Sequence, residues 1–93
     1  MFFVYILFSK KLNRFYVGTT DNVEKRLFEH NSRLYINAFT TKGIPWELFL
    51  SHSCESSEKA YKLERFIKRM KSKKFIERLI EDEMIINNIV AKL

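Results

Sequence analysis

Residues 2–18 read FFVYILFSKKLNRFYVG, two apolar runs on either side of a short basic turn. The first run, residues 2–8, is rich in β-branched and aromatic side chains, and the second, residues 14–18, ends at a glycine. Strands favour these residue types, and the polar residues between the runs favour a turn. The stretch therefore predicts a β-hairpin at the start of the fold.

The length of the hairpin loop decides where the two central tyrosines point. With a four-residue loop over residues 9–12, Phe8 pairs with Asn13. Tyr5 then stands directly opposite Tyr16, and both rings share one face of the sheet. A five-residue loop would send the rings to opposite faces, because side chains alternate along a strand. Only the first alternative allows the two tyrosines to belong to one site.

A helix is predicted over residues 22–31. Asp21 and Glu24 have the spacing of a capping box with the aspartate as N-cap. Apolar residues recur at helical intervals, and Arg26 and His30 lie on the same side as this stripe. We therefore expect a cation and an imidazole beside the buried face of the helix.

Beyond this helix, the pattern predicts a loop, a third strand and two more helices. Residues 32–45 read as a loop that ends near a glycine and a proline, and residues 46–51 alternate as a strand. Serines then cap a long helix, on which Glu64 borders the apolar stripe. Ser72 can cap the last helix. The members of the apolar stripe are Ala60, Leu63, Ile67 and Met70.

The order strand, strand, helix, strand, helix, helix predicts an α+β fold, a small three-stranded antiparallel β-sheet flanked by helices. A chain of 93 residues has enough surface for one core, so we expect a single domain over residues 1–83. The acidic run at residues 81–83 is expected to end the last helix. Residues 84–93 form an extension of unassigned conformation: a helical turn, a strand, or an apolar contact that could form a homodimer.

Positive charge is concentrated in one segment. The net charge is +6, and residues 59–78 hold nine of the seventeen basic residues against two glutamates. Such a field favours a polyanion, most often nucleic acid, although a solvated helix face would look the same. The basic residues predicted to bind nucleic acid are Lys59, Lys62, Arg65, Lys68, Arg69, Lys71, Lys73 and Lys74.

Several classes of protein are not expected. The longest stretch without a charged residue, 1–9, is far shorter than the roughly 20 residues of a membrane helix. Its apolar residues precede the lysines, unlike a secretory signal, so we expect a cytoplasmic protein that contacts no membrane. Cys54 has no partner for a disulfide, and two histidines without cysteine spacing predict no structural zinc.

Five polar positions in the hairpin and helices have a distinctive order. The tyrosines of VYIL and FYVG are eleven residues apart, Arg26 follows Gly18 by eight residues, and His30 comes four later. Glu64 follows on a downstream helix. This pattern resembles the GIY-YIG nuclease domain over nearly the whole chain. More narrowly, LERFIKRMKSKKFIERLI is similar to the late helices of the small stand-alone bacterial GIY-YIG proteins.

The resemblance implies a metal and a phosphate contact. Glu64 would hold a single divalent ion, Mg²⁺ or Mn²⁺, and one carboxylate suits Mg²⁺ because this ion keeps most of its waters. Arg26 would contact the scissile phosphate, since its planar guanidinium matches phosphate oxygens and stays charged. Taken alone, Arg26 would more simply form a surface ion pair with Glu29 or Glu24.

The resemblance also implies a tyrosine as general base. A free phenol is a poor base at neutral pH, so it needs a cation or a histidine acceptor nearby. We predict that Tyr5 has this role with His30 receiving its proton, and that Tyr16 is its substitute or orients water and phosphate. Gly18, at the end of the second strand, is expected to permit a close approach of the backbone at the end of the sheet.

Three positions depart from the family pattern. Val4 stands where the first half of the motif has a glycine. Thr19 follows Gly18 where some members have a lysine, and Ile76 lies twelve residues after the glutamate, where some branches have an asparagine. Val4 resembles the residue that the small stand-alone group has at this position. Thr19 and Ile76 would each remove a contact at the site, so they predict reduced or narrow activity.

Three functions follow from these features. The leading prediction is a metal-dependent DNA endonuclease for repair or processing, directed by DNA structure rather than by a long sequence, with RNA not excluded. The second is a nucleic-acid-binding module that keeps the scaffold but cleaves poorly or not at all. The third is an interaction protein that associates through residues 84–93.

Overall fold

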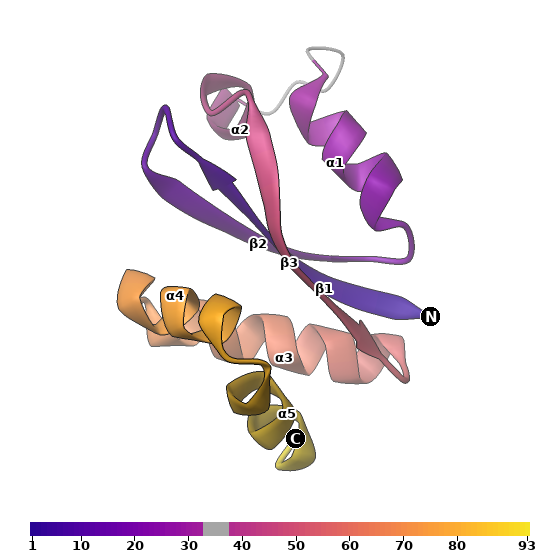
Figure 1. Cartoon of the computed structure of the whole chain (residues 1–93). Helices are drawn as coiled ribbons and strands as arrows, with labels where there is room; N and C mark the ends of the chain where they lie inside the picture. Colours follow the sequence, from indigo (N-terminus) through magenta and orange to yellow (C-terminus); the bar gives the residue numbers. More distant parts are fainter. Residues whose placement is uncertain (33–37) are drawn as a thin grey trace.

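A three-stranded antiparallel sheet with helices on both faces forms the fold (Figure 1). The structure is a computed structural model that describes residues 1–32 and 38–93. Its strands lie in the order β2-β1-β3. The elements are β1 (Phe2–Ser9), β2 (Arg14–Thr20), α1 (Val23–Asn31), α2 (Ala38–Lys42), β3 (Trp46–Cys54), α3 (Ser57–Met70), α4 (Lys73–Glu81) and α5 (Glu83–Ala91). The predicted fold class is thus confirmed, with α2 and α5 in addition.

The register of the hairpin differs from the predicted one by two residues. Phe8 pairs with Phe15, so the expected pairing of Phe8 with Asn13 is wrong. Asn13 has a φ of 53°, a left-handed conformation that asparagine tolerates, and it belongs to the turn rather than to the strand. Because two residues are a full period of a strand, the side chains keep their predicted faces. Tyr5 and Tyr16 share one face, but Tyr5 lies opposite Gly18.

The start of α1 and the following segment also correct the prediction. The N-cap is Asn22, not Asp21, and its side chain accepts a hydrogen bond from the backbone N–H of Lys25. Residues 38–42, inside the predicted loop, form the short helix α2. The rest of that loop, residues 33–37, lies outside the described residues. The third strand continues beyond its predicted end, to Cys54.

The lower layer in Figure 1 consists of α3, α4 and α5 against one face of the sheet. Leu63 and Ile67 of α3 are buried there as predicted, whereas Met70 is exposed. Ser72 caps α4 as expected, and Asp82 ends that helix and caps α5. The C-terminal segment is therefore helical, and its Ile86 is buried in the same aliphatic core.

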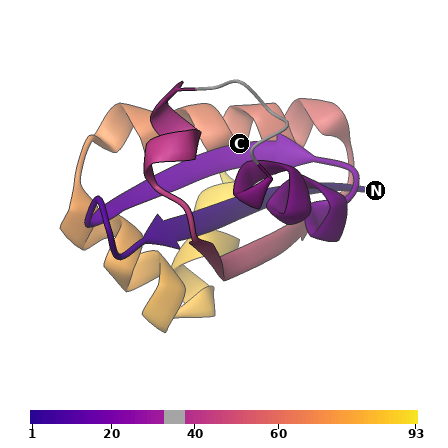
Figure 2. The same ribbon diagram turned by 90° about the horizontal axis from the view of Figure 1, so that it is seen from above.

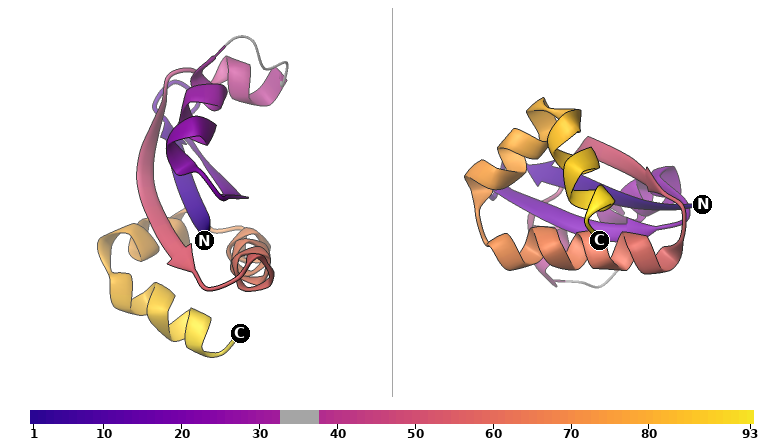
Figure 3. Two further views of the ribbon diagram at one scale, coloured as in Figure 1. Left: turned by 90° about the vertical axis from the view of Figure 1, so that its right-hand side faces the viewer. Right: turned by 90° about the horizontal axis from the view of Figure 1, so that it is seen from below.

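The upper layer holds α1 and α2 over the opposite face of the sheet (Figures 1 and 3). Its small core consists of Tyr5, Leu7 and Trp46, and their polar atoms have partners. The indole N–H of Trp46 donates to the carbonyl of Thr40 at 2.7 Å. Asn31, the last residue of α1, exchanges two hydrogen bonds with the backbone of Trp46, at 2.6 and 3.0 Å. These contacts fix the end of α1 to β3.

Candidate active site

Gly18 lets the side chain of Tyr5 extend over the neighbouring strand on one face of the sheet. Tyr5 lies on the central strand β1, and its cross-strand partner on the edge strand β2 is Gly18. A Cβ atom at position 18 would lie 2.5 Å from the hydroxyl oxygen of Tyr5, closer than real Cβ atoms come to other atoms. The absence of a side chain therefore leaves room for the phenol above β2. The group that lies closest to the Cβ position of Gly18 is thus the Tyr5 ring. The predicted close approach of the Gly18 backbone stays a prediction.

The hydroxyl of Tyr5 forms a hydrogen bond with Nε2 of His30 at 3.0 Å. Burial lowers the pKa of His30, the nearby Arg26 lowers it further, and Glu29 opposes both. A neutral imidazole accepts at one ring nitrogen, so the Tyr5 hydroxyl can donate to Nε2. The contact therefore joins a phenol to a base that is uncharged at neutral pH.

The pKa of Tyr5 is raised to about 12. Burial is the largest cause, since its side chain is 1% exposed, and Tyr16 adds to the effect. Arg26 is close enough to lower this pKa, and the carboxylate of Glu64 is close enough to raise it. Two ionic side chains from different layers thus act on the same hydroxyl group.

Tyr16 stacks beside Tyr5 on the face covered by α1. The ring centroids of the two tyrosines are 6.3 Å apart, and that of Tyr16 is 4.6 Å from that of His30. Tyr5 is buried, whereas Tyr16 is half-buried and lines a cavity. Of the two tyrosines, Tyr16 is thus more accessible to a molecule outside the protein.

Arg26 lies on α1 and forms the ion pair that a simple surface residue would form. Its Nη1 is 3.2 Å from Oε1 of Glu29. Glu29 is the less exposed partner, so the pair lies at the edge of the upper layer rather than free in solvent. Although paired with Glu29, the guanidinium of Arg26 is still close enough to Tyr5 to lower the pKa of its hydroxyl.

Glu64 reaches the site from α3, on the other side of the sheet. Thr19 Oγ1 donates a hydrogen bond to its Oε1 at 2.5 Å, and Nζ of Lys68 lies 3.0 Å from its Oε2. Its side chain is 21% exposed. Thr19 is next to Gly18 on the edge strand, so the carboxylate is held at the sheet edge that the Tyr5 ring approaches.

Two cavities flank this edge. One, of about 460 Å³, lies between β2 and the junction of α3 and α4, and both Tyr16 and Lys68 line it. The other, of about 360 Å³, lies where β2 leads into α1, and both Thr19 and Arg26 line it. Site residues therefore open onto solvent on both sides of β2.

Three of the eight basic residues predicted to bind nucleic acid line one of these cavities. Lys68, Lys71 and Lys73 line the larger cavity, together with Arg14 from the hairpin. The other five are not among the residues that line the two cavities. These others are Lys59, Lys62, Arg65, Arg69 and Lys74.

The donor set suits a metal ion that keeps its waters. Within residues 1–32 and 38–93, no group of three or more His, Cys, Asp or Glu side chains could hold a metal ion. Glu64 offers one carboxylate, whose Oε2 contacts an exposed lysine side chain. Its two hydrogen-bond partners, Lys68 and Thr19, each line one of the two cavities. A hard divalent ion such as Mg²⁺ is often bound by one carboxylate, water and substrate phosphate.

Sequence reasoning missed three functional neighbours. Thr19 was noted only because some family members have a lysine at this position. Since side chains alternate along β2, Thr19 points to the face opposite that of Gly18, which is the face covered by α3. Arg14 and Lys25 line the two cavities and were not singled out. Their exposure beside turn residues gave no signal in the sequence.

Comparisons with known proteins agree with this geometry at the level of the family. No curated protein and no solved structure matched the chain. No helix among the described residues is long and apolar enough to cross a membrane. The family model of the GIY-YIG catalytic domain matches residues 1–77. The chain therefore belongs to the GIY-YIG family, whose members are nucleases that act on nucleic acid and generally depend on a divalent metal ion.

Proposed function

We propose that this protein is an endonuclease that hydrolyses DNA phosphodiester bonds with Mg²⁺ or Mn²⁺, in the repair or processing of DNA in the cytoplasm. The observation that carries the proposal is the hydrogen bond between Tyr5 and His30. Arg26 and Glu64 lie close enough to the Tyr5 hydroxyl to shift its pKa, in opposite directions. Residues 1–83 would form the catalytic domain, with residues 84–93 as an extension packed on it.

In this proposal, Tyr5 relays a proton rather than acting as a standing phenolate. With a pKa of about 12, the phenolate is present in roughly one molecule in 10⁵ at pH 7. The hydroxyl can instead accept a proton from the attacking water while it passes its own proton to Nε2 of His30. His30 is suited to this step because its lowered pKa keeps it neutral.

The other site residues position the phosphate and stabilise its charge. Arg26 would bind two phosphate oxygens through its guanidinium, and Tyr16 would orient the water or the phosphate from the larger cavity. Glu64, held by Thr19, would be the ligand of the metal ion. That ion, when bound, supplies positive charge that stabilises the phosphorus oxygens and the departing oxygen.

We propose that the substrate is recognised by structure, with branched, damaged and single-stranded DNA in that order of preference. The cavities beside β2 are lined by lysine and arginine side chains, which contact phosphates and carry little base information. RNA has the same phosphate charge, so the basic residues alone do not favour DNA over it.

A second candidate, a binding module that cleaves poorly, is favoured by one observation. The carboxylate proposed to bind the metal ion is engaged by Thr19 and Lys68. Self-association through residues 84–93 receives less support, because the apolar residues of α5 pack against the protein's own core.

The test is a nicking assay on labelled duplex, branched and single-stranded DNA with Mg²⁺ or Mn²⁺. Tyr5→Phe should lower the cleavage rate about 10²- to 10⁴-fold, as expected for loss of a general base. Glu64→Gln should lower it at least as far. DNA affinity, measured by fluorescence anisotropy without metal, should not fall in either variant.

The same helix offers matched controls. Glu58 is an exposed glutamate paired with a lysine four residues later, as Glu64 is, and Tyr61 is an exposed tyrosine. Glu58→Gln and Tyr61→Phe should retain cleavage. If the wild type binds DNA but cuts none of the three substrates with either metal ion, the binding module replaces the endonuclease. Equal losses in control and site variants would contradict the assigned roles.

A further inference from the structure

Lys68 occupies the place on Glu64 that a cation would take. Its ammonium is 3.0 Å from Oε2, while Thr19 donates to Oε1 of the same carboxylate. The two side chains differ in exposure, 53% for Lys68 and 21% for Glu64. The carboxylate is therefore held in place, whereas the lysine can swing into solvent.

The chain contains a second ion pair with the same spacing and another setting. Lys62 lies 3.2 Å from Glu58, also four residues apart on α3, but there the glutamate is the more exposed partner at 77%. Exposed pairs of this kind contribute little, because water screens them. The comparison shows what is particular to Lys68: its partner is a half-buried carboxylate at the sheet edge.

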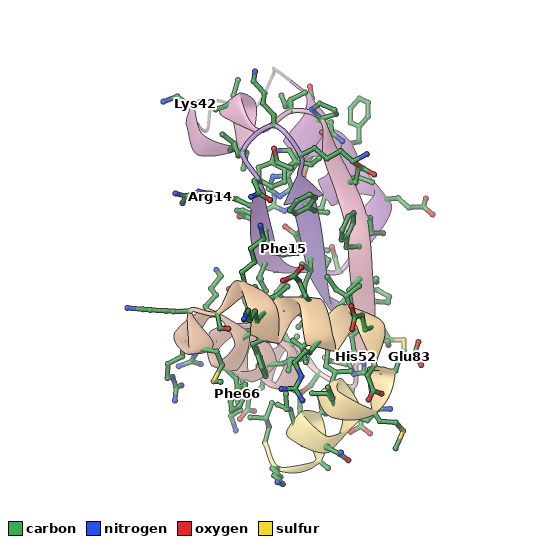
Figure 4. The ribbon with its side chains drawn as sticks, turned by 60° about the vertical axis from the view of Figure 1, so that its left-hand side comes forward. Arg14, Phe15, Lys42, His52, Phe66 and Glu83 are labelled. Atoms are coloured by element: carbon green, nitrogen blue, oxygen red, sulfur yellow. The ribbon has the colours of Figure 1, made fainter. Side chains whose placement is uncertain are left out.

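Lys68 also lines the larger cavity, of about 460 Å³. Lys71, Lys73 and Arg14 line the same cavity, and its floor includes the apolar Val17. Figure 4 shows Arg14 extending outward from the hairpin above the layer of α3 and α4. Four cations around one cavity, with no acidic residue among the described residues that line it, suit a phosphate group.

We propose that this cavity binds a phosphate of the substrate strand and that Lys68 couples its occupation to metal binding at Glu64. Without substrate, Lys68 is the counter-ion of Glu64 and competes with the metal ion. A phosphate in the cavity draws the ammonium away from Oε2 and frees that oxygen. The proposal rests on the proposed function for the identity of the two ligands.

The coupling follows from charge alone. A lysine that stays beside Glu64 repels a divalent cation and must be displaced before the cation binds. A lysine that turns to a phosphate costs the metal ion nothing, and the phosphate gains a contact. Since linkage is reciprocal, metal binding must then raise the affinity for the phosphate by the same factor.

The first experiment measures Mn²⁺ binding without DNA, by broadening of the backbone amide resonances of Thr19 and Glu64. The variants are Lys68→Gln and, as the matched control, Lys62→Gln, which removes an equal charge from the same helix. We expect Lys68→Gln to bind Mn²⁺ about three- to tenfold more tightly than Lys62→Gln. Equal affinities in the two variants, including no measurable binding in both, would overturn the proposal.

The second experiment adds a short single-stranded DNA oligonucleotide in a Tyr5→Phe background, in which cleavage is slow. The oligonucleotide should raise Mn²⁺ affinity more in Tyr5→Phe than in Tyr5→Phe with Lys68→Gln. An equal rise in both proteins would mean that Lys68 does not carry the coupling. Glu64→Gln should abolish the broadening, which shows that the ion is bound at this carboxylate.

Failure of this inference and failure of the proposed function give different results. If Lys68→Gln binds Mn²⁺ more tightly but no variant cleaves DNA, the coupling stands and the endonuclease does not. If the wild type cleaves DNA and Lys68→Gln binds Mn²⁺ like Lys62→Gln, only the coupling is wrong. With both correct, Lys68→Gln binds metal more tightly yet binds DNA more weakly.

Discussion

Helices α1 and α3 both carry residues of the candidate site, but they are attached to the sheet in different ways. Helix α3 buries Leu63 and Ile67 in the aliphatic core, whereas no residue of α1 is buried. Helix α1 packs the partly buried Val23 and Leu27 on the small upper core. It is also held by polar contacts, through Asn31 at its end and through His30 to Tyr5. Figure 2, the view from above, shows α1 lying over the sheet on the side opposite α3.

This difference in attachment suggests that the lower layer mainly stabilises the fold, whereas the upper layer orients the side chains of the candidate site. Apolar burial is non-directional and needs no polar partners in the core. The lower layer can therefore be a rigid support for Glu64 through apolar packing alone. The upper layer has a smaller apolar core and adds hydrogen bonds, whose geometry is directional and which orient His30 and Tyr5. Substitutions in the two layers should therefore have different effects.

The largest expected effect is on the lower layer. Leu63→Ala removes a fully buried side chain and should lower the free energy of unfolding by about 2–5 kcal/mol. Urea denaturation followed by circular dichroism measures this loss. Leu48→Ala, at a position that is 41% exposed, is the control and should change it by less than about 0.5 kcal/mol. A loss below 1 kcal/mol in Leu63→Ala would remove the contrast between the layers.

A methyl group at Gly18 should affect mainly the upper layer, by displacing the Tyr5 ring. Gly18→Ala places a Cβ within 2.5 Å of the Tyr5 hydroxyl oxygen, so the ring must move away from His30. We expect a loss of about 1–3 kcal/mol in stability and about 100-fold in cleavage. The second loss is measured by the nicking assay.

A double variant tests whether the methyl acts through the ring. If it does, Gly18→Ala should cost less stability in a Tyr5→Leu background, and the two losses should not add. Strict additivity would show that the strain at Gly18 is relieved without Tyr5.

The anchor of α1 should matter to both stability and cleavage. Asn31→Ala removes two hydrogen bonds to the Trp46 backbone and should cost about 1–3 kcal/mol in unfolding free energy. Cleavage should fall as well, since α1 positions Arg26 and His30. Asn87→Ala, at an exposed position of α5, is the control for both measurements. Unchanged cleavage in Asn31→Ala would mean that α1 is positioned by other contacts.

The smallest expected effect is on the pH dependence of stability. The pKa of His30 is lowered from 6.5 by burial, so the unfolded chain binds more protons and stability falls as pH drops below 6.5. The pKa of Tyr5 is raised from 10.0 to about 12, so the folded chain binds more protons and stability falls as pH rises above 10. Urea unfolding across pH measures both slopes.

Variants assign the two slopes to their residues. His30→Gln should flatten the acid slope and Tyr5→Phe the alkaline one. The pKa of His52 is also lowered by burial, so His52→Gln is needed to separate its share of the acid slope. An alkaline slope that is unchanged in Tyr5→Phe would contradict the burial of this phenol as its cause.

The sequence predicted the faces of the hairpin better than its pairs. Tyr5 and Tyr16 share a face as expected, because side chains alternate along a strand and a register error of two residues leaves every side chain on its face. The pair partners were wrong by two residues, since Asn13 joins the turn by taking a left-handed conformation that no pattern of apolar residues reveals. The same limit explains why α2 was predicted as a loop, because five residues are too few to show a helical period.

The sequence by itself determined the three strands, the helices α1, α3 and α4, the apolar stripe of α3 and the family pattern of tyrosine, arginine, histidine and glutamate. These depend on periodicity and spacing within short segments, which residue order records. Only the tertiary structure decided that Thr19 and Lys68 share the carboxylate of Glu64 and that the Tyr5 ring crosses above Gly18. Such contacts join residues far apart in the chain, and they form only when the packing of two layers against one sheet brings them together.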